Sequence, residues 1–173
     1  IREHTIRSIT QINNQKLMLT PGPAVVLQEN IQYLKPFFGR GDDEYEKIYS
    51  AVMDWIKQLS GQDEVISMQG SATLALELAA HSFISGRVLL VSTGYYSDKL
   101  IHLLPESCLV TICKYEDLSK IDDGFDWVVC AYTEISNAFK LDLQSVKNKA
   151  DETGAKLFVD ATGSIGLEND HQL

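Results

Sequence analysis

A single acid at the end of an apolar strand is the sharpest chemical feature of this chain. The run Leu157–Val159 predicts a buried β-strand, and Asp160 follows it directly. A carboxylate in that position has to be paired or hydrogen-bonded, because an unpaired buried charge is very costly. Two uses fit Asp160: a cap for the turn 161–163, or a partner for a protonated ring nitrogen of a bound ligand.

A turn of small residues that opens directly into a helix pattern is the second feature. The segment Gly70-Ser71-Ala72-Thr73 precedes the helix pattern Leu74–Ala80. It offers backbone N–H groups, two hydroxyl groups and the positive end of a helix dipole, which suit a phosphate group. The turn lacks the lysine of a Walker A loop and the spacing of a dinucleotide fingerprint, which argues against a nucleotide. A plain helix cap is the other interpretation.

The composition is that of an ordinary globular protein and excludes several partners. Of the 173 residues, 45% are hydrophobic and 23% are charged, and the net charge is −9. A negative balance argues against a nucleic-acid or anionic-membrane surface. No apolar run approaches the roughly 20 residues of a membrane span, and no signal-peptide pattern opens the sequence. Cys108, Cys113 and Cys130 have no CxxC spacing, so we expect reduced core cysteines of a cytoplasmic protein and no metal site.

Apolar runs that alternate with helix patterns predict a three-layer α/β fold. The expected helices are Ser71–Ile84, Tyr96–Leu104 and Asp142–Thr153, and the expected strands are Arg87–Ser92, Leu109–Cys113, Trp127–Ala131 and Leu157–Val159, after a short apolar run at Val65–Met68. Continuous apolar strands separated by helices indicate a mostly parallel sheet with helices on both faces.

The clearest helix pattern runs from Asp42 to Leu59. Its apolar residues follow i, i+3, i+4, i+7 spacing and predict one buried stripe. The acidic triplet Asp42–Glu44 suits the positive end of this helix better than it suits a metal ion, and Gly61 suits the helix end. The stripe consists of Tyr45, Ile48, Tyr49, Val52, Trp55, Ile56 and Leu59.

The chemistry is expected at one edge of the predicted sheet. In open α/β sheets, ligands bind outside the carboxyl ends of the strands. Four segments are expected to leave strands at that edge: Gln69–Thr73, Ser92–Ser97, Tyr132–Ala138 and Asp160–Ser164.

Five short motifs occur in an order and spacing similar to those of the class V aminotransferases. They are Thr20-Pro21-Gly22-Pro23, Gly70-Ser71-Ala72-Thr73, Gly94-Tyr95-Tyr96, Thr133-Glu134-Ile135-Ser136 and Asp160-Ala161-Thr162, and they span about residues 17–168. This family contains alanine–glyoxylate, serine–pyruvate and 2-aminoethylphosphonate–pyruvate transaminases. It uses pyridoxal 5'-phosphate, which carries both a phosphate and a cationic ring nitrogen. The resemblance therefore implies the large domain of a fold-type I pyridoxal-phosphate enzyme.

The resemblance implies a role around the cofactor for each matching residue. Ser71, Ala72 and Thr73 would hold the phosphate. Tyr96 would stack on one face of the pyridine ring, and Thr162 would contact the opposite face. Asp160 would bond the ring nitrogen and keep the ring an effective electron sink. A plain core aromatic at Tyr96 and an ordinary turn residue at Thr162 are the alternatives.

Other matching positions depart from the family pattern. The segment Glu134–Ser136 would lie near the ring oxygen and the phosphate, with Ser136 as a cofactor contact, although Ile135 stands where the family has Ser or Thr. Asn137-Ala138 replaces a Thr-Gly pair. Gly22 would lie near the substrate entrance, and Gly39-Arg40 replaces a His-Arg pair, so Arg40 is a candidate for altered substrate specificity.

The resemblance places the Schiff-base lysine on a strand beyond Asp160. The sequence ends at Leu173, and Lys99, Lys140 and Lys156 lie in no matching context. We therefore expect an N-terminal arm at residues 1–25, followed at 26–173 by the first part of the cofactor-binding domain. We expect this fragment alone not to transaminate. The resemblance also implies a homodimer.

The leading hypothesis is a transaminase that moves an amino group from a small amino acid or aminophosphonate to an oxo acid. A cysteine desulfurase-like lyase shares the fold, but its ring-stacking histidine is replaced here by Tyr96. A non-catalytic nucleotide-binding α/β module is the third hypothesis, and the lack of either glycine fingerprint opposes it.

Overall fold

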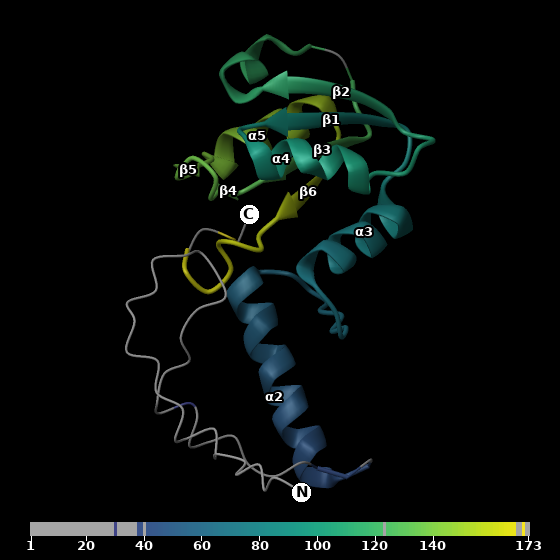
Figure 1. Ribbon diagram of the computed structural model, residues 1–173, viewed down its shortest axis with the longest axis vertical. Helices are drawn as coiled ribbons and strands as arrows, with labels where there is room; N and C mark the ends of the chain where they lie inside the picture. Colours follow the sequence, from purple (N-terminus) through teal and green to yellow (C-terminus); the bar gives the residue numbers. More distant parts are fainter. Residues whose placement is uncertain (1–29, 31–37, 40, 123, 169–170, 172–173) are drawn as a thin grey trace, which may run out of the picture. The chain divides into compact units, whose positions relative to one another are not determined.

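The computed structural model describes residues 30, 38–39, 41–122, 124–168 and 171, which are drawn in colour in Figure 1. The expected arm at residues 1–25, together with Gly22 and Arg40, lies outside these residues. The chain divides into two compact units, Ile1–Ala51 and Val52–Leu173. Within the described part, no helix has the length and apolar character that a bilayer span requires.

A four-stranded parallel sheet forms the centre of the second unit. Its strands lie in the order β2-β1-β3-β6, and every neighbouring pair is parallel. The register pairs Leu90 with both Ile112 and Val129, and it pairs Ala131 with Asp160. The predicted α/β fold is therefore confirmed. The strands are β1 (Arg87–Ser92), β2 (Leu109–Lys114), β3 (Trp127–Ala131) and β6 (Lys156–Asp160).

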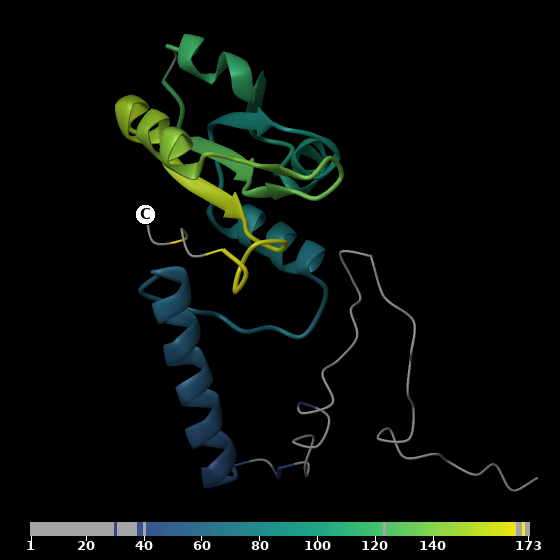
Figure 2. The same cartoon turned by 90° about the vertical axis from the view of Figure 1, so that its left-hand side faces the viewer.

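Helices cover both faces of the sheet, as the apolar strands predicted. Alternate residues of β1 and β3 point to opposite faces, so each central strand contributes to two cores. One core packs against α5 (Leu143–Thr153) and the 3-10 segment η3 (Tyr115–Lys120). The other packs against α3 (Ala72–Phe83) and the 3-10 segment η2 (Leu100–Leu103), which continues α4 (Tyr95–Lys99). Figures 1 and 2 show α5 on one side of the sheet and α4 on the other.

Two helices begin and end where the sequence predicted. Ser71 caps α3, because its hydroxyl oxygen accepts a hydrogen bond from Leu74 N at 3.2 Å. Asp142 caps α5 by accepting from Ser145 N at 3.4 Å, and Gly154 ends that helix in the left-handed region, with φ 70°. Such caps satisfy backbone groups that a helix end leaves unpaired.

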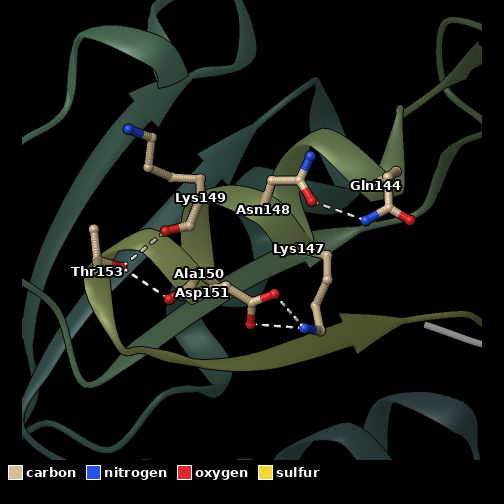
Figure 3. Close-up of polar contacts among 7 residues, drawn as sticks. All are labelled: Gln144, Lys147, Asn148, Lys149, Ala150, Asp151 and Thr153. Atoms are coloured by element: carbon tan, nitrogen blue, oxygen red, sulfur yellow. Dashed lines mark hydrogen bonds and ion pairs between the residues drawn. The ribbon is translucent and has the colours of Figure 1, made fainter.

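The outer side of α5 carries pairs of polar side chains at i, i+4 spacing (Figure 3). Lys147 Nζ lies 2.6 Å from both carboxylate oxygens of Asp151, and Gln144 Nε2 donates to Asn148 Oδ1 at 2.9 Å. Exposed pairs of this kind each contribute about 0.3–0.5 kcal/mol. Burial on the other side therefore stabilises the helix more, and the residues buried there are Leu143, Val146 and Ala150.

The predicted buried stripe of the helix α2 (Asp43–Ser60) is wrong. The helix itself forms as expected: Asp42 Oδ1 accepts from Glu44 N at 2.9 Å, and Gly61 follows the last turn with φ 68°. No residue of α2 is buried, and the Trp55 side chain is 60% exposed. Amphipathic spacing shows that a helix has an apolar face, but it does not show what covers that face.

Two further elements differ from the sequence analysis. Residues 65–68 form no strand, and Ile66 is 84% exposed. A run of four apolar residues is too short for periodicity to decide its structure. The structure also contains a short antiparallel hairpin, β4 (Thr133–Glu134) with β5 (Phe139–Lys140), that the sequence analysis did not predict.

Candidate functional site

Three loops meet at the carboxyl ends of β1, β3 and β6. The loops after β1 and β3 are hydrogen-bonded to each other: Asn137 Nδ2 donates to Thr93 O at 2.8 Å, and Tyr95 N donates to Ser136 Oγ at 3.4 Å, in addition to the bonds to Glu134 described below. The turn after β6 packs against the hairpin, since a Cβ at Gly163 would lie 2.7 Å from Thr133 Oγ1. The structure therefore brings together three of the four segments expected at this edge.

Glu134, in the hairpin after β3, lies between this hairpin and the segment that follows β1. It is 1% exposed, and its carboxylate accepts hydrogen bonds from both loops. Oε2 accepts from Tyr96 N and Ser97 N, each at 3.0 Å. Oε1 accepts from Ser136 N at 3.2 Å and from Ser136 Oγ at 2.5 Å. Four hydrogen-bond donors around this buried carboxylate stabilise its negative charge without a neighbouring cation.

Hydrogen bonding holds the pKa of Glu134 below its usual value. Burial raises this pKa, but the Ser136 hydroxyl and the N–H groups of Ser97, Tyr96 and Ser136 together lower it by more. Glu134 is therefore ionised at neutral pH.

The lowered pKa predicts a pH dependence of stability. A carboxyl group with a depressed folded-state pKa stabilises the fold above its unfolded-state pKa, about 4.3 for Glu, and loses that effect as the pH falls through the folded-state value. We expect the free energy of unfolding of the wild type to exceed that of Glu134→Gln by an amount that shrinks below about pH 4.3. Urea unfolding at a series of pH values measures this difference. A difference that stayed constant into acid would contradict the ionised state of Glu134.

The loop after β1 fits closely around this carboxylate. Ser97 is fully buried, and its hydroxyl accepts from Thr93 N at 2.8 Å and donates to Gly94 O at 2.8 Å. Gly94 has φ 156°, and a Cβ there would lie 2.7 Å from Glu134 Cγ and 3.0 Å from Asn137 Nδ2. Glycine is the residue that such a close approach allows.

Asp160 ends β6 with half of its carboxylate in use. Oδ1 accepts from Thr162 N at 2.9 Å, whereas Oδ2 accepts no hydrogen bond from the residues that the structure describes. The side chain is half-buried. On the neighbouring strand β3, burial raises the pKa of the Cys130 thiol to about 12, with a further contribution from the charge of Asp160. Asp160 is thus an acid with one oxygen left for a ligand.

Two buried hydroxyl groups lie at the same edge of the sheet. Thr93 follows β1 and Thr133 begins the hairpin after β3, and neither Oγ1 has a hydrogen-bond partner among the described residues. Buried hydroxyl groups are nearly always paired, since an unpaired one costs about 1–3 kcal/mol. Neither threonine was predicted as a site residue; a threonine soon after a buried strand is the signal that could have indicated them.

Sequence comparison relates this chain to aminotransferases. No protein-family model matches it. An uncharacterized aminotransferase of Helicobacter pylori is 21% identical over 167 residues, which cover 88% of this chain and 45% of that protein. A 2-aminoethylphosphonate–pyruvate transaminase of Pseudomonas fluorescens is 23% identical over 167 residues, covering 87% of this chain and 45% of the relative. The chain spans about half the length of the curated relatives it matches.

Solved structures show the same fold. The ureidoglycine–glyoxylate aminotransferase of Bacillus subtilis matches with a TM-score of 0.75 at 18% identity, over 89% of this chain and 45% of that one. The pyridoxamine–pyruvate aminotransferase of Mesorhizobium loti matches with a TM-score of 0.74 at 21% identity, over 86% and 42%. The resemblance to the class V aminotransferases is confirmed.

The predicted phosphate-binding turn, Gly70–Thr73, lies at the start of α3 and is not hydrogen-bonded to the other three loops within the described residues. Residues 71–73 begin α3, they are exposed, and the Ser71 hydroxyl is used in the cap of that helix. No strand precedes the turn, contrary to expectation, and no hydrogen bond joins Gln69–Thr73 to the other three loops within the described residues.

The expected ring contacts lie on the converging loops. Tyr96 is 38% exposed and meets Tyr95 edge-on, with ring centroids 5.1 Å apart. Its backbone N–H is held by Glu134. Thr162 is exposed in the turn that follows Asp160, and Ser136 is exposed beside Glu134. Gly22 and Arg40, the substrate-side candidates, lie outside the described residues.

The departure from the aminotransferase pattern at Ala138 has a conformational cost. Ala138 has φ 57°, in the left-handed region, at the position where the family has glycine. In the folded state, alanine in this conformation is about 1–2 kcal/mol less favourable than glycine. The greater conformational entropy of glycine in the unfolded state offsets part of that difference. We expect Ala138→Gly to raise the free energy of unfolding by about 0.5–1 kcal/mol in urea unfolding. A destabilising effect would show that the left-handed conformation is not retained in solution.

Proposed function

We propose that the full-length protein is a pyridoxal-phosphate-dependent aminotransferase, with the cofactor ring at the carboxyl ends of β1, β3 and β6. The observation that carries this proposal is Asp160 Oδ2, which accepts no hydrogen bond within the described residues, at the sheet edge where Tyr96 and Thr162 also lie. A ring nitrogen needs an acceptor, and a ring oxygen or phosphate needs donors, so the groups present fit the cofactor.

The residues of this chain divide the work of holding that cofactor. Asp160 would bond the ring nitrogen with Oδ2 while Oδ1 stays bonded to Thr162 N, so the acid would need no rearrangement. Tyr96 and Thr162 would cover the two ring faces and exclude water from them. Ser71, Ala72 and Thr73 would hold the phosphate with the N–H groups at the start of α3.

Ser136 would act through the loop it stabilises. Its hydroxyl has one proton, which it donates to Glu134, so it would present lone pairs and no O–H group to a phosphate. We therefore assign Ser136 to fixing its loop beside the cofactor, and assign the donor role to the N–H groups at the start of α3.

The bound cofactor would supply an electron sink for the carbanion that forms when the substrate loses a proton. The chain's contribution is to keep the ring nitrogen protonated: an ionised Asp160 next to it favours the charged form of the nitrogen. A proton held at that atom makes the ring a better acceptor of electrons.

The names of the relatives support a small amino acid or aminophosphonate as donor and an oxo acid as acceptor. We propose a cytoplasmic homodimer, and a covalent lysine outside this chain. Two of the three lysines considered above have other contacts: Lys140 Nζ lies 2.6 Å from Glu168 Oε2, and Lys156 Nζ lies 5.3 Å from the centre of the Trp127 ring. This chain alone would therefore not transaminate.

Ligand titration tests the proposal. We expect pyridoxal phosphate to bind and to change its absorption spectrum, and we expect adenine nucleotides not to bind. Binding of the nucleotides without binding of pyridoxal phosphate would favour the nucleotide-binding alternative. For this chain alone, borohydride reduction is expected to leave Lys99, Lys140 and Lys156 unmodified. Stoichiometric reductive attachment of the cofactor to one of them would contradict the assignment of the covalent lysine.

A further inference from the structure

Glu134 is a buried charge whose hydrogen bonds lie across two loops. Its side chain comes from the hairpin after β3, while Tyr96 and Ser97 come from the loop after β1, 38 and 37 residues earlier in the sequence. An ionised carboxylate that is 1% exposed costs several kcal/mol of desolvation. That cost is offset only where the donors around it are well placed.

The donors around Glu134 are themselves fixed. Three are backbone N–H groups, of Tyr96, Ser97 and Ser136, and the fourth is the Ser136 hydroxyl. Among the described residues, no Lys, Arg or His forms an ion pair with Glu134. The carboxylate is therefore held by peptide dipoles, whose positions follow the backbone and not a flexible side chain.

A second set of contacts joins the segment after β1 to the hairpin after β3. Asn137 Nδ2 donates to Thr93 O at 2.8 Å, and Gly94 approaches Glu134 so closely that a Cβ would lie 2.7 Å from Cγ. The position of the Tyr96 backbone is thus determined by the hairpin, and the hairpin also packs against the turn after Asp160 through Thr133 and Gly163.

We propose that Glu134 is a positioning residue that sets the Tyr96 ring relative to Asp160. This proposal rests on the proposed function, because a ring contact matters only if a cofactor ring lies there. Glu134 is 1% exposed, so it has almost no surface with which to contact a cofactor or substrate directly. It bonds the backbone N–H of Tyr96, which would cover one ring face. It also bonds Ser136 of its own hairpin, which packs against the turn after Asp160.

Glutamine at this position separates the charge from the shape. Glu134→Gln keeps the size of the side chain, but one carboxylate oxygen becomes an NH₂ group that cannot accept a hydrogen bond. Either the N–H groups of Tyr96 and Ser97 or the donors of Ser136 then face another donor. We expect the first turn of α4 to loosen while the sheet beneath it stays folded.

The experiment compares the full-length wild type with Glu134→Gln, and uses Glu106→Gln as the matched control because Glu106 is exposed in the loop before β2. In the cofactor-free protein, we expect amide hydrogen exchange at Tyr96 and Ser97 to be about tenfold faster in Glu134→Gln. At saturating pyridoxal phosphate, we expect a smaller circular dichroism signal in the cofactor band, and in a cofactor titration we expect about tenfold weaker binding. The control should match the wild type in all three.

The outcomes separate the two proposals. A residue that serves stability alone would lower the melting temperature and leave the dichroism of the bound cofactor unchanged, and this result would overturn the positioning role. A wild-type protein that takes up no pyridoxal phosphate would overturn the proposed function itself. If Glu134→Gln does not fold, Glu134→Asp replaces it: the charge is kept but retracted from Tyr96 and Ser97, and the same three measurements decide.

Discussion

Replacing Gly94 with alanine is expected to lower the free energy of unfolding by about 3 kcal/mol. The new methyl group would meet Glu134 Cγ at 2.7 Å and Glu134 Cδ at 2.9 Å, inside the contact distance of carbon atoms. Glu134 is bonded to the backbone on both sides and Gly94 is at φ 156°, so neither can move without breaking hydrogen bonds. Urea unfolding of the two proteins measures the difference.

Gly124→Ala is the matched control for this prediction. A Cβ at Gly124 meets nothing within 4 Å, and its φ is not in the left-handed region. We expect that substitution to change the free energy of unfolding by less than about 0.5 kcal/mol. If Gly94→Ala were equally neutral, the close packing of the loop after β1 against Glu134 would not exist in solution.

Replacing Asp160 with asparagine is expected to weaken pyridoxal phosphate uptake and turnover by the full-length protein about 10- to 100-fold. The amide oxygen of asparagine can still accept from Thr162 N, so the turn after β6 should be unchanged. What is lost is the negative charge that keeps the ring nitrogen protonated. Cofactor titration and steady-state turnover measure the two effects.

Asp122→Asn serves as the control, since Asp122 is an exposed acid before β3. It should leave uptake and turnover unchanged. Equal activity of Asp160→Asn and the wild type would contradict the assigned role of Asp160. A loss of folded structure in Asp160→Asn would show that the negative charge stabilises the fold, since asparagine keeps the hydrogen bond from Thr162 N.

The elements that the sequence predicted well are those specified by local patterns. The bounds of β3 match the predicted strand because a continuous apolar run is buried between two neighbours in a parallel sheet. The bounds of α5 match because Asp142 and Gly154 form its caps from within the helix's own sequence. Asp160 was found because an acid after such a strand is chemically unusual.

The parts that could not be predicted depend on distant residues. The residues next to Glu134 in the sequence do not show that its carboxylate is buried, because two of its four donors, the N–H groups of Tyr96 and Ser97, belong to α4. The unpaired hydroxyl groups of Thr93 and Thr133 depend in the same way on packing at the sheet edge. The prediction of a buried stripe on α2 failed for the opposite reason: the apolar pattern is local, but burial depends on other parts of the chain.

A crystal structure of the full-length protein with pyridoxal phosphate tests the central claim most directly. We predict the pyridine ring between Tyr96 and Thr162, its nitrogen within hydrogen-bond distance of Asp160 Oδ2, and its phosphate at the N–H groups of residues 71–73. A cofactor bound elsewhere, or an Asp160 carboxylate paired with a lysine or arginine of the protein, would contradict the account.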